Sequence, residues 1–230
     1  MKLKLVEKRE EAKGTVSFFW EPEKPVDFLA GQYYYFSIPK LKYPDSKGTT
    51  RHFTISSSPT EGNLLWITTR IREKSGYKKT LNELPIDTEI EGEGPNGTFI
   101  LDEKDIGPQV FIAGGVGITP FRSIIKYAID KNIQTPMYLI YSNSDSQFVF
   151  KDEFDKWASQ NDYFKVSYFD SSVSGHLDST KLQPLLTTYN ILHTTFWLAG
   201  PPPMVDAMEQ VLGKLKITSD KIRSEKFTGY

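Results

Sequence analysis

Hydrophobic and polar residues alternate over short stretches in the first hundred residues of the chain. Each stretch is bounded by glycine, proline, aspartate, asparagine or serine, and they cover residues 3–12, 14–23, 31–40, 51–57, 64–73 and 88–101. Short alternating stretches at this spacing are typical of strands in an antiparallel barrel or sandwich. One short helix, around Tyr77–Leu84, is expected to interrupt them.

The pattern changes near Lys104, where helical stretches begin to alternate with short apolar strands. Residues 119–132 carry apolar side chains at helical spacing: Phe121, Ile124, Ile125, Ala128 and Ile129. Strand patterns occupy 108–115, 136–143, 164–170 and 194–200, and further helix patterns occupy 150–160 and 202–215. Such alternation implies a parallel sheet covered on both faces. We therefore expect two domains, an antiparallel β-barrel over residues 1–104 and a doubly wound α/β domain over residues 105–230.

Composition narrows the function classes. The chain has 230 residues, a formal net charge of −1 and no cysteine. This charge balance is unlike that of a nucleic-acid-binding protein. The lack of cysteine excludes disulfides, thiolate zinc sites and an iron–sulfur cluster held by cysteines of this chain. The histidines His52, His176 and His193 show no ligand spacing, so we expect no metal site.

No segment has the pattern of a membrane span or of a signal peptide. The most apolar stretch, Val110–Ile129, is interrupted by glycines, a proline, Arg122 and Lys126. The first fourteen residues lack the apolar core of a signal peptide. We therefore expect a soluble cytoplasmic protein without nucleic-acid or membrane partners.

A glycine-rich loop follows the first strand of the second half. Gly114, Gly115 and Gly117 would let the main chain approach a phosphate, whose charge the N–H groups at the next helix start would meet. Thr119 suits the N-cap and Pro120 suits the first helical turn. The loop departs from the G-x-G-x-x-G fingerprint, because its third glycine would fall at Pro120. A tight turn without a ligand is the alternative interpretation.

Two more loops are expected at the same edge of the parallel sheet. Ligands of open α/β sheets bind outside the carboxyl ends of the strands. The second strand ends in a polar segment and the strand over 194–200 ends in a glycine–proline segment. Together these loops provide seven candidate nucleotide-binding residues: Asn143, Ser144, Asp145, Gly200, Pro201, Pro202 and Met204.

Residues 51–59, RHFTISSSP, combine a cation, an aromatic ring and hydroxyl groups in one extended segment. Together with AGQYYYF, SGYKKTL, GPNG, GGVGITP, AGPPPM and EKFTGY, in that order, this segment resembles the ferredoxin–NADP reductase family of flavin-dependent NAD(P)H oxidoreductases. The resemblance covers nearly the whole chain. It implies that residues 1–104 bind FAD and that residues 105–230 bind NADH or NADPH.

The resemblance also implies roles for individual residues. Phe53 would stack on the isoalloxazine, Thr54 would place a catalytic hydroxyl near its N5–O4 edge, and Arg51 would hold a phosphate oxygen. Further flavin contacts would come from His52, Thr69, Ile71, Ser75, Gly76, Tyr77 and Lys78. The alternative for the Arg51 segment is a barrel strand whose arginine makes a surface ion pair, and the alternative for Lys78 is a solvated helix lysine.

The chain departs from the family pattern near its end. Ala199 stands where many relatives have a cysteine beside the nicotinamide. Glu225 is the nearest carboxylate for a catalytic proton relay, although a surface glutamate is the alternative that its sequence position favours. Tyr230, the last residue, would cover the flavin, lie on the adenine side or be disordered.

In the implied reaction, NAD(P)H passes a hydride to FAD, and electrons continue to a separate acceptor. The acceptor would be a ferredoxin, a flavodoxin, an oxygenase component or a small acceptor. Asp145 favours NADH, whereas Lys151 could restore binding of the NADPH phosphate. One alternative is a flavin-bearing subunit of a larger complex, such as a dihydroorotate dehydrogenase assembly, and another is a flavin-free nucleotide sensor.

Overall fold

The computed structural model describes residues 1–186 and 193–228, which form two compact units. The first unit contains Met1–Leu101 together with Arg122–Tyr127, and the second contains Asp102–Phe121 and the described residues of Ala128–Thr228. Among the helices described, none has both the length and the hydrophobicity needed to cross a membrane.

The first unit is built on one antiparallel sheet. Its strands are β1 (Lys2–Ala12), β2 (Thr15–Pro22), β3 (Tyr33–Ser37), β4 (Thr50–Thr54), β5 (Leu65–Arg70) and β6 (Glu89–Asn96). They lie in the order β4-β3-β6-β1-β2-β5, and a bridge between Ile55 and Ile67 joins the two edges. Closing the edges in this way turns a sheet into a barrel and leaves few unpaired backbone groups. The antiparallel barrel predicted from the alternating pattern is confirmed.

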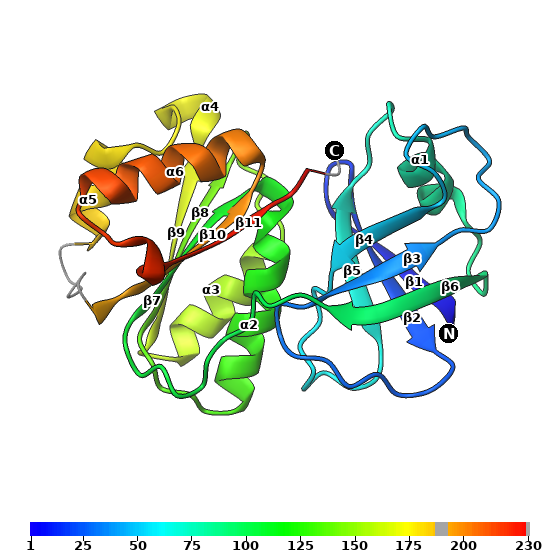
Figure 1. Cartoon of the computed structure of the whole chain (residues 1–230), viewed down its shortest axis with the longest axis horizontal. Coiled ribbons are helices and arrows are strands. Elements are labelled where there is room, and N and C mark those ends of the chain that lie inside the picture. The colour runs from blue at the N-terminus through cyan, green and yellow to red at the C-terminus, as the bar shows by residue number, and fades with distance from the viewer. Residues whose placement is uncertain (187–192, 229–230) are drawn as a thin grey trace. The chain divides into compact units, whose positions relative to one another are not determined.

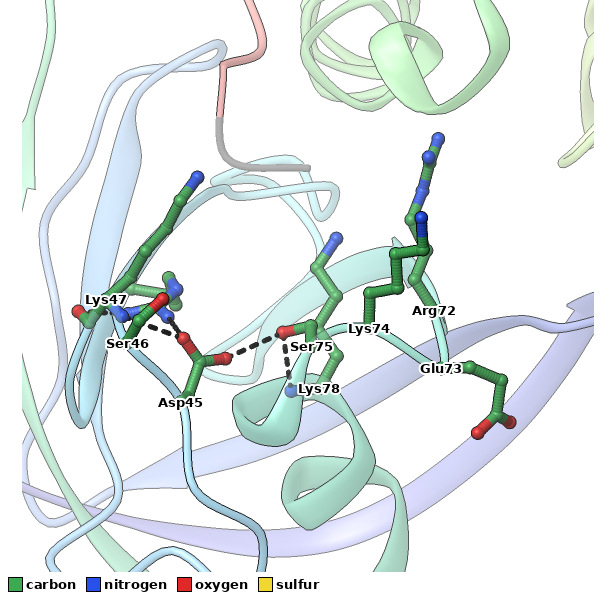
Figure 2. A pocket seen from close by; sticks show the side chains of 9 residues that line it. Asp45, Ser46, Lys47, Arg72, Glu73, Lys74, Ser75 and Lys78 are labelled. Carbon is green, nitrogen blue, oxygen red and sulfur yellow. Dashed lines mark hydrogen bonds and ion pairs between the residues drawn. The ribbon is translucent and has the colours of Figure 1, made fainter.

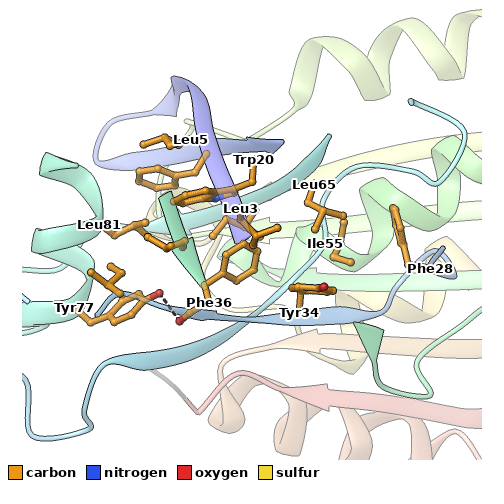
Figure 3. Packing of buried hydrophobic residues seen from close by; sticks show 14 residues of the cluster. Leu3, Leu5, Trp20, Phe28, Tyr34, Phe36, Ile55, Leu65, Tyr77 and Leu81 are labelled. Atoms are coloured by element: carbon orange, nitrogen blue, oxygen red, sulfur yellow. Dashed lines mark hydrogen bonds between the residues drawn. The ribbon is translucent and has the colours of Figure 1, made fainter. Parts of the chain in front are cut away.

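The barrel core is aliphatic and aromatic, and the short helix α1 (Gly76–Glu83) contributes to it. Figure 3 shows Tyr77 and Leu81 of this helix directed toward the same core as Phe36 and Trp20 of the strands. The Tyr77 hydroxyl donates a 2.8 Å hydrogen bond to the Phe36 carbonyl, so its polar end is satisfied inside the core. This anchoring fixes where α1 begins relative to β3 and β4.

The second unit contains a parallel sheet. Its strands are β7 (Gln109–Gly114), β8 (Met137–Asn143), β9 (Phe164–Asp170), β10 (Thr195–Gly200) and β11 (Ile222–Lys226), in the order β11-β10-β7-β8-β9. The intervening helices are α2 (Ile118–Asp130), α3 (Lys151–Gln160), α4 (Ser171–Ser174), α5 (Ser179–Leu186) and α6 (Pro202–Lys214), with η1 (Gly115–Gly117) and η3 (Ser219–Lys221). The predicted parallel α/β architecture is therefore confirmed.

The sheet order reverses between β7 and β10. The chain runs outward from β7 to β8 and β9, then returns to the other side of β7 with β10 and β11. Because parallel crossovers are right-handed, this reversal places α2 and α3 on one face and α5 and α6 on the other, as Figure 1 shows. In open α/β sheets, the carboxyl ends of the two strands on either side of such a reversal, here β7 and β10, form a ligand-binding position.

Three features of the second unit were not expected from the sequence pattern. Strand β11 pairs with β10 at the sheet edge, although its residues alternate only weakly between polar and apolar. Helix α5 contains Pro184, and because proline is unfavourable inside a helix, the sequence did not predict a helix there. Phe150 has a left-handed backbone (φ 61°) and precedes α3, so the predicted helix over 150–160 begins one residue later.

Candidate functional site

The glycine loop forms a tight connection between β7 and α2. Strand β7 ends at Gly114, and a single 3₁₀ turn over Gly115–Gly117 leads directly into the helix. Thr119 lies inside the first turn of α2, where its hydroxyl donates to the Val116 carbonyl at 3.1 Å. The expectation that Thr119 is the N-cap is therefore wrong, because the 3₁₀ turn moves the helix start to Ile118. Pro120 lies within the first turn, as predicted.

Three loops meet at the carboxyl edge of the parallel sheet, as the sequence predicted. A Cβ atom on Gly117 would lie 2.2 Å from the Ala199 carbonyl oxygen, and one on Gly200 would lie 3.1 Å from the Gly114 Cα. A Cβ on Gly115, which has φ +54°, would lie 3.9 Å from the Asn143 side-chain oxygen. These close approaches require glycine at Gly117 and bring main-chain groups together between β7 and β10, where the strand order reverses. We call this position the switch point.

The loop after β10 supplies two prolines and a methionine. Pro201 precedes α6 and Pro202 is its first residue, which suits the proline φ angle at a helix start. The Met204 sulfur would lie 3.2 Å from a Cβ on Gly114. The side chain of Met204 therefore adds an apolar surface next to the glycine loop.

The loop after β8 is a polar turn organised by Asp145. One oxygen of Asp145 accepts hydrogen bonds from the Asn143 amide at 3.0 Å and from the Gln147 N–H at 2.9 Å. Ser144 between them is exposed. The turn thus presents a half-buried carboxylate at the sheet edge near the glycine loop. Lys151, at the start of α3, pairs with Asp155 and lies over the Tyr168 ring.

In the first unit, β4 presents the residues of the Arg51 segment. Phe53 is half-buried, and its ring lies 6.0 Å from that of Phe36 and 6.1 Å from that of Tyr77. His52 is exposed and packs against the rings of Tyr33 and Tyr35. Thr54 is buried at the end of the strand. Strand alternation therefore separates Arg51 and Phe53 from His52 and Thr54.

Two further predicted flavin residues lie at the end of β5. Thr69 is buried, with 1% of its surface exposed, and Ile71 is half-buried and packs against the barrel core. Ile71 donates its N–H to the Gly14 carbonyl. The segment that follows, residues 72–75, leads directly to α1.

A cavity of about 260 Å³ lies at the N-terminus of α1. Five cationic and two anionic side chains line it, together with two serines: Lys47, Arg51, Arg72, Lys74, Lys78, Asp45, Glu73, Ser46 and Ser75. Figure 2 shows Lys47 and Asp45 on one side of this cavity and Arg72, Lys74 and Lys78 on the other. We call it the cationic cavity. Its charge balance and its helix N-terminus favour an anionic ligand.

Ser75 and Lys78 connect the cavity to the helix. Ser75 is the N-cap of α1, and its hydroxyl accepts from the Lys78 N–H at 3.2 Å. The Lys78 side chain is almost fully buried. Burial, together with the neighbouring charges of Arg72, Arg51 and Lys47, lowers the pKa of Lys78 to about 8. Lys78 is therefore not a solvated helix lysine, and an anion in the cavity would raise its pKa again.

Asp45 is held by four hydrogen bonds in this cavity. One carboxylate oxygen accepts from Arg51 at 2.6 Å and from the Lys47 N–H at 2.9 Å. The other accepts from the Ser75 hydroxyl at 3.0 Å and from the Tyr77 N–H at 2.9 Å. Burial raises the pKa of Asp45, but these hydrogen bonds and the Arg51 charge outweigh burial and lower it to about 2.

Arg51 is consequently an internal residue. Besides Asp45, its guanidinium donates to three main-chain carbonyls of the preceding loop, those of Lys47, Gly48 and Thr50. Its side chain is only 10% exposed, so the alternative of a surface ion pair is wrong. Whether Arg51 also holds a phosphate stays a prediction. Asp45 was not identified from the sequence, although PDSKG is a turn signal just before Arg51.

Glu225 lies on β11 in register with Ala199 of β10. It is half-buried, and one of its oxygens has no hydrogen-bond partner among the described residues. Burial raises its pKa to about 7, so the interpretation as an ordinary surface glutamate is not supported. Its catalytic role stays a prediction. Tyr230 lies outside the described residues.

Comparisons with known proteins agree with this arrangement. Residues 111–210 match the oxidoreductase NAD-binding domain. The chain is 31% identical over 221 residues to the electron transfer component of 2-halobenzoate 1,2-dioxygenase from Burkholderia cepacia. This alignment covers 90% of the chain and 61% of the relative. The chain spans between 58% and 61% of the length of several curated relatives that it matches.

Two solved structures cover almost the whole chain. The FAD/NAD-binding domain of nitric oxide dioxygenase from Vibrio cholerae has a TM-score of 0.81 at 18% identity and covers 98% of both chains. A ferredoxin–NADP⁺ reductase variant from Plasmodium falciparum has a TM-score of 0.80 at 18% identity and covers 98% of this chain and 95% of its own. Residues 111–210 thus belong to the oxidoreductase NAD-binding domain family, and with the antiparallel barrel that precedes them the chain has the two-domain fold of these solved reductases.

Proposed function

We propose that this chain is a reductase that binds FAD on residues 1–104 and NAD(P)H on residues 105–230. When bound, FAD accepts a hydride from NAD(P)H and passes electrons to a separate acceptor. The observation that carries the proposal is the presence, in one chain, of an NAD-binding domain and of a barrel with a cationic cavity. The protein's contribution is to position the two ligands and exclude water, rather than to supply acid–base chemistry.

The cationic cavity fits the diphosphate of FAD. Its net positive charge, the Ser75 hydroxyl and the N-terminus of α1 are the groups that bind phosphate oxygens in proteins. Lys78 would add a charge, because an anion beside it favours its protonated form. Phe53 and Thr54, at the end of β4, would contact the isoalloxazine. These residues would bind and orient the flavin.

The switch point of the second unit fits the phosphates of NAD(P)H. The main-chain groups of Gly115 and Gly117 lie at the start of α2, where the helix dipole favours negative charge. Pro201 and Met204 would flank the nucleotide from the loop after β10. Glu225, beside Ala199 in the register, would hold a proton near neutral pH, since burial raises its pKa to about 7.

For the acceptor we propose a separate redox partner, with an oxygenase component as the first candidate. The relative from Burkholderia cepacia is named as the electron transfer component of a dioxygenase. An iron–sulfur cluster held by cysteines of this chain is excluded, because the sequence has none. The flavin-bearing subunit of a larger complex is the second candidate.

The purified chain tests this proposal directly. We expect a yellow protein that contains FAD in about a 1:1 ratio and oxidises NAD(P)H steadily with an artificial acceptor. A chain that takes up neither FAD nor a nicotinamide nucleotide contradicts the proposal. A flavin-loaded chain that turns over only when another subunit is added favours the complex instead.

We expect Asp145 to determine the preference between NADH and NADPH. Its carboxylate suits a ribose hydroxyl and repels the additional phosphate of NADPH, while Lys151 is already paired with Asp155. We expect kcat/KM for NADH to exceed that for NADPH by about 100-fold, because like charges brought together cost several kcal/mol.

The variant Asp145→Asn keeps an oxygen acceptor for the Asn143 amide and the Gln147 N–H but removes the charge. It should lower the NADH-to-NADPH ratio of kcat/KM about tenfold. Asp152→Asn, on the first turn of α3, is the matched control. A wild-type preference for NADPH, or an unchanged ratio in Asp145→Asn, would show that this carboxylate does not face the ribose.

A further inference from the structure

The Asp45 carboxylate uses donors that the cationic cavity would offer to a phosphate. It accepts from the Arg51 guanidinium, the Ser75 hydroxyl and the Tyr77 N–H, at distances between 2.6 and 3.0 Å. The last two mark the start of α1, and Arg51 is the cation assigned to a phosphate oxygen. A carboxylate and a phosphate oxygen compete for such donors because both are anionic acceptors of similar geometry. A phosphate that takes these same donor groups must displace Asp45 from them.

The carboxylate is a strong competitor in its present position. Its side chain is 8% exposed and that of Arg51 is 10% exposed, so water does little to screen the pair. Each carboxylate oxygen accepts two hydrogen bonds, and three of the four come from outside the turn that Asp45 forms with Lys47. Figure 2 shows Asp45 turned toward Ser75 and the start of α1.

The segment that carries Asp45 is exposed and is held mainly by hydrogen bonds, including those from Arg51 to the Lys47, Gly48 and Thr50 carbonyls. Between Pro44 and Thr50, every residue except Asp45 is exposed. Gly48 has φ +78° and nothing lies within 4 Å of where its Cβ would be. Asp45 is therefore the one residue of this turn that is not exposed, and its side chain is directed inward, as Figure 2 shows.

We propose that Asp45 sets the affinity of the cationic cavity by competing, as an internal carboxylate, with the diphosphate of the bound flavin. This inference rests on the proposed FAD site. The turn between Pro44 and Thr50 must release Arg51, Ser75 and the Tyr77 N–H before a diphosphate can bind them. The apparent affinity for the diphosphate equals the intrinsic affinity multiplied by the fraction of protein molecules in which Asp45 has left these donors.

The test compares Asp45→Asn with the wild-type chain. Asparagine preserves the turn with Lys47 and removes the negative charge, so it competes less well for Arg51. We expect the Kd for inorganic pyrophosphate, measured by calorimetry, and the Kd for FAD, measured by flavin fluorescence, to fall about tenfold. The melting temperature of the flavin-free variant should fall by about 4 °C, because the buried pair is lost.

Glu73→Gln is the matched control. Glu73 lines the same cavity, but its side chain is 89% exposed and pairs with Lys79 on α1 rather than with Arg51 or Ser75. Its removal should change either Kd by no more than about twofold, because an exposed charge acts only through a screened field. Equal tightening in both variants would overturn the proposal, since the effect would then be one of net charge.

Tighter binding of pyrophosphate and FAD together with a lower melting temperature would show that Asp45 competes with the ligand rather than positioning Arg51 for it. If Asp45 merely positions Arg51, Asp45→Asn will bind pyrophosphate and FAD more weakly, or unchanged, and the proposal is overturned. If pyrophosphate binding tightens while neither variant nor the wild-type chain binds FAD, the competition stands and the proposed function falls. The two claims therefore have separate readouts.

Discussion

Arg51→Ala is expected to release flavin and to destabilise the barrel unit strongly. The guanidinium holds Asp45 and three main-chain carbonyls, those of Lys47, Gly48 and Thr50. Its removal leaves a carboxylate with 8% exposure without the guanidinium that pairs with it. Breaking a buried pair from one side costs about 3–5 kcal/mol. We expect a stability loss of that size and a rise in the Kd for FAD of at least about 100-fold.

Flavin content of the purified variant and its thermal unfolding measure the two effects. Arg70→Ala, an exposed residue at the end of β5, is the control and should change neither. The double variant Arg51→Ala with Asp45→Asn should recover part of the lost stability, because it no longer buries an uncompensated charge. Full flavin occupancy in Arg51→Ala would refute its assignment to a phosphate.

The alternating pattern of the first hundred residues predicted the barrel because each strand has one face in the core. Strand β3 shows this directly, since its buried Tyr34 and Phe36 belong to the core and alternate with the half-buried Tyr33, Tyr35 and Ser37. Helix α1 was predicted almost to the residue, because a serine and a glycine precede an apolar tyrosine that the core requires. Both signals come from residues that are close together in the sequence, so the sequence alone was enough to predict these elements.

The features that were missed depend on contacts distant in sequence. Strand β11 is stabilised by pairing with β10 and by the register of Glu225 with Ala199, so its own residues carry little signal. Asp45 binds Ser75, which lies 30 residues away. No spacing rule connects these two positions. An acidic turn residue before a predicted phosphate-binding arginine is, in retrospect, the signal that was available.

The two candidate ligand sites use different physical means to attract phosphate. The cationic cavity relies on side-chain charges, which are partly cancelled by Asp45. Burial, and after it the neighbouring cations, lower the pKa of Lys78 to about 8. The switch point of the second unit offers main-chain groups at glycines, without a cationic side chain in the loop Gly114–Thr119. Mutation of side chains should therefore affect flavin binding most, and mutation of glycine should affect nicotinamide nucleotide binding most.

Gly117→Ala is expected to weaken productive binding of the nicotinamide nucleotide about 100-fold while leaving flavin content unchanged. The new Cβ would lie 2.2 Å from the Ala199 carbonyl oxygen and 2.7 Å from the Gly200 Cα. Both atoms belong to the backbone of β10, so no side-chain rotation relieves the overlap and the loop must move. Overpacking of this kind costs about 1–3 kcal/mol or more, and a displacement near 1 Å at a binding loop costs about 100-fold in rate.

Steady-state kinetics with NADH measure this effect as a fall in kcat/KM of about 100-fold, with thermal unfolding recorded on the same sample. Gly213→Ala is the matched control, because nothing lies within 4 Å of its added Cβ and it lies near the end of α6. Alanine there should add about 0.5–1 kcal/mol of stability, since glycine is a poor helix residue. A Gly117→Ala chain with wild-type kcat/KM would mean that NADH does not bind at the β7–β10 edge, because a shifted glycine loop there could not leave its phosphates in place.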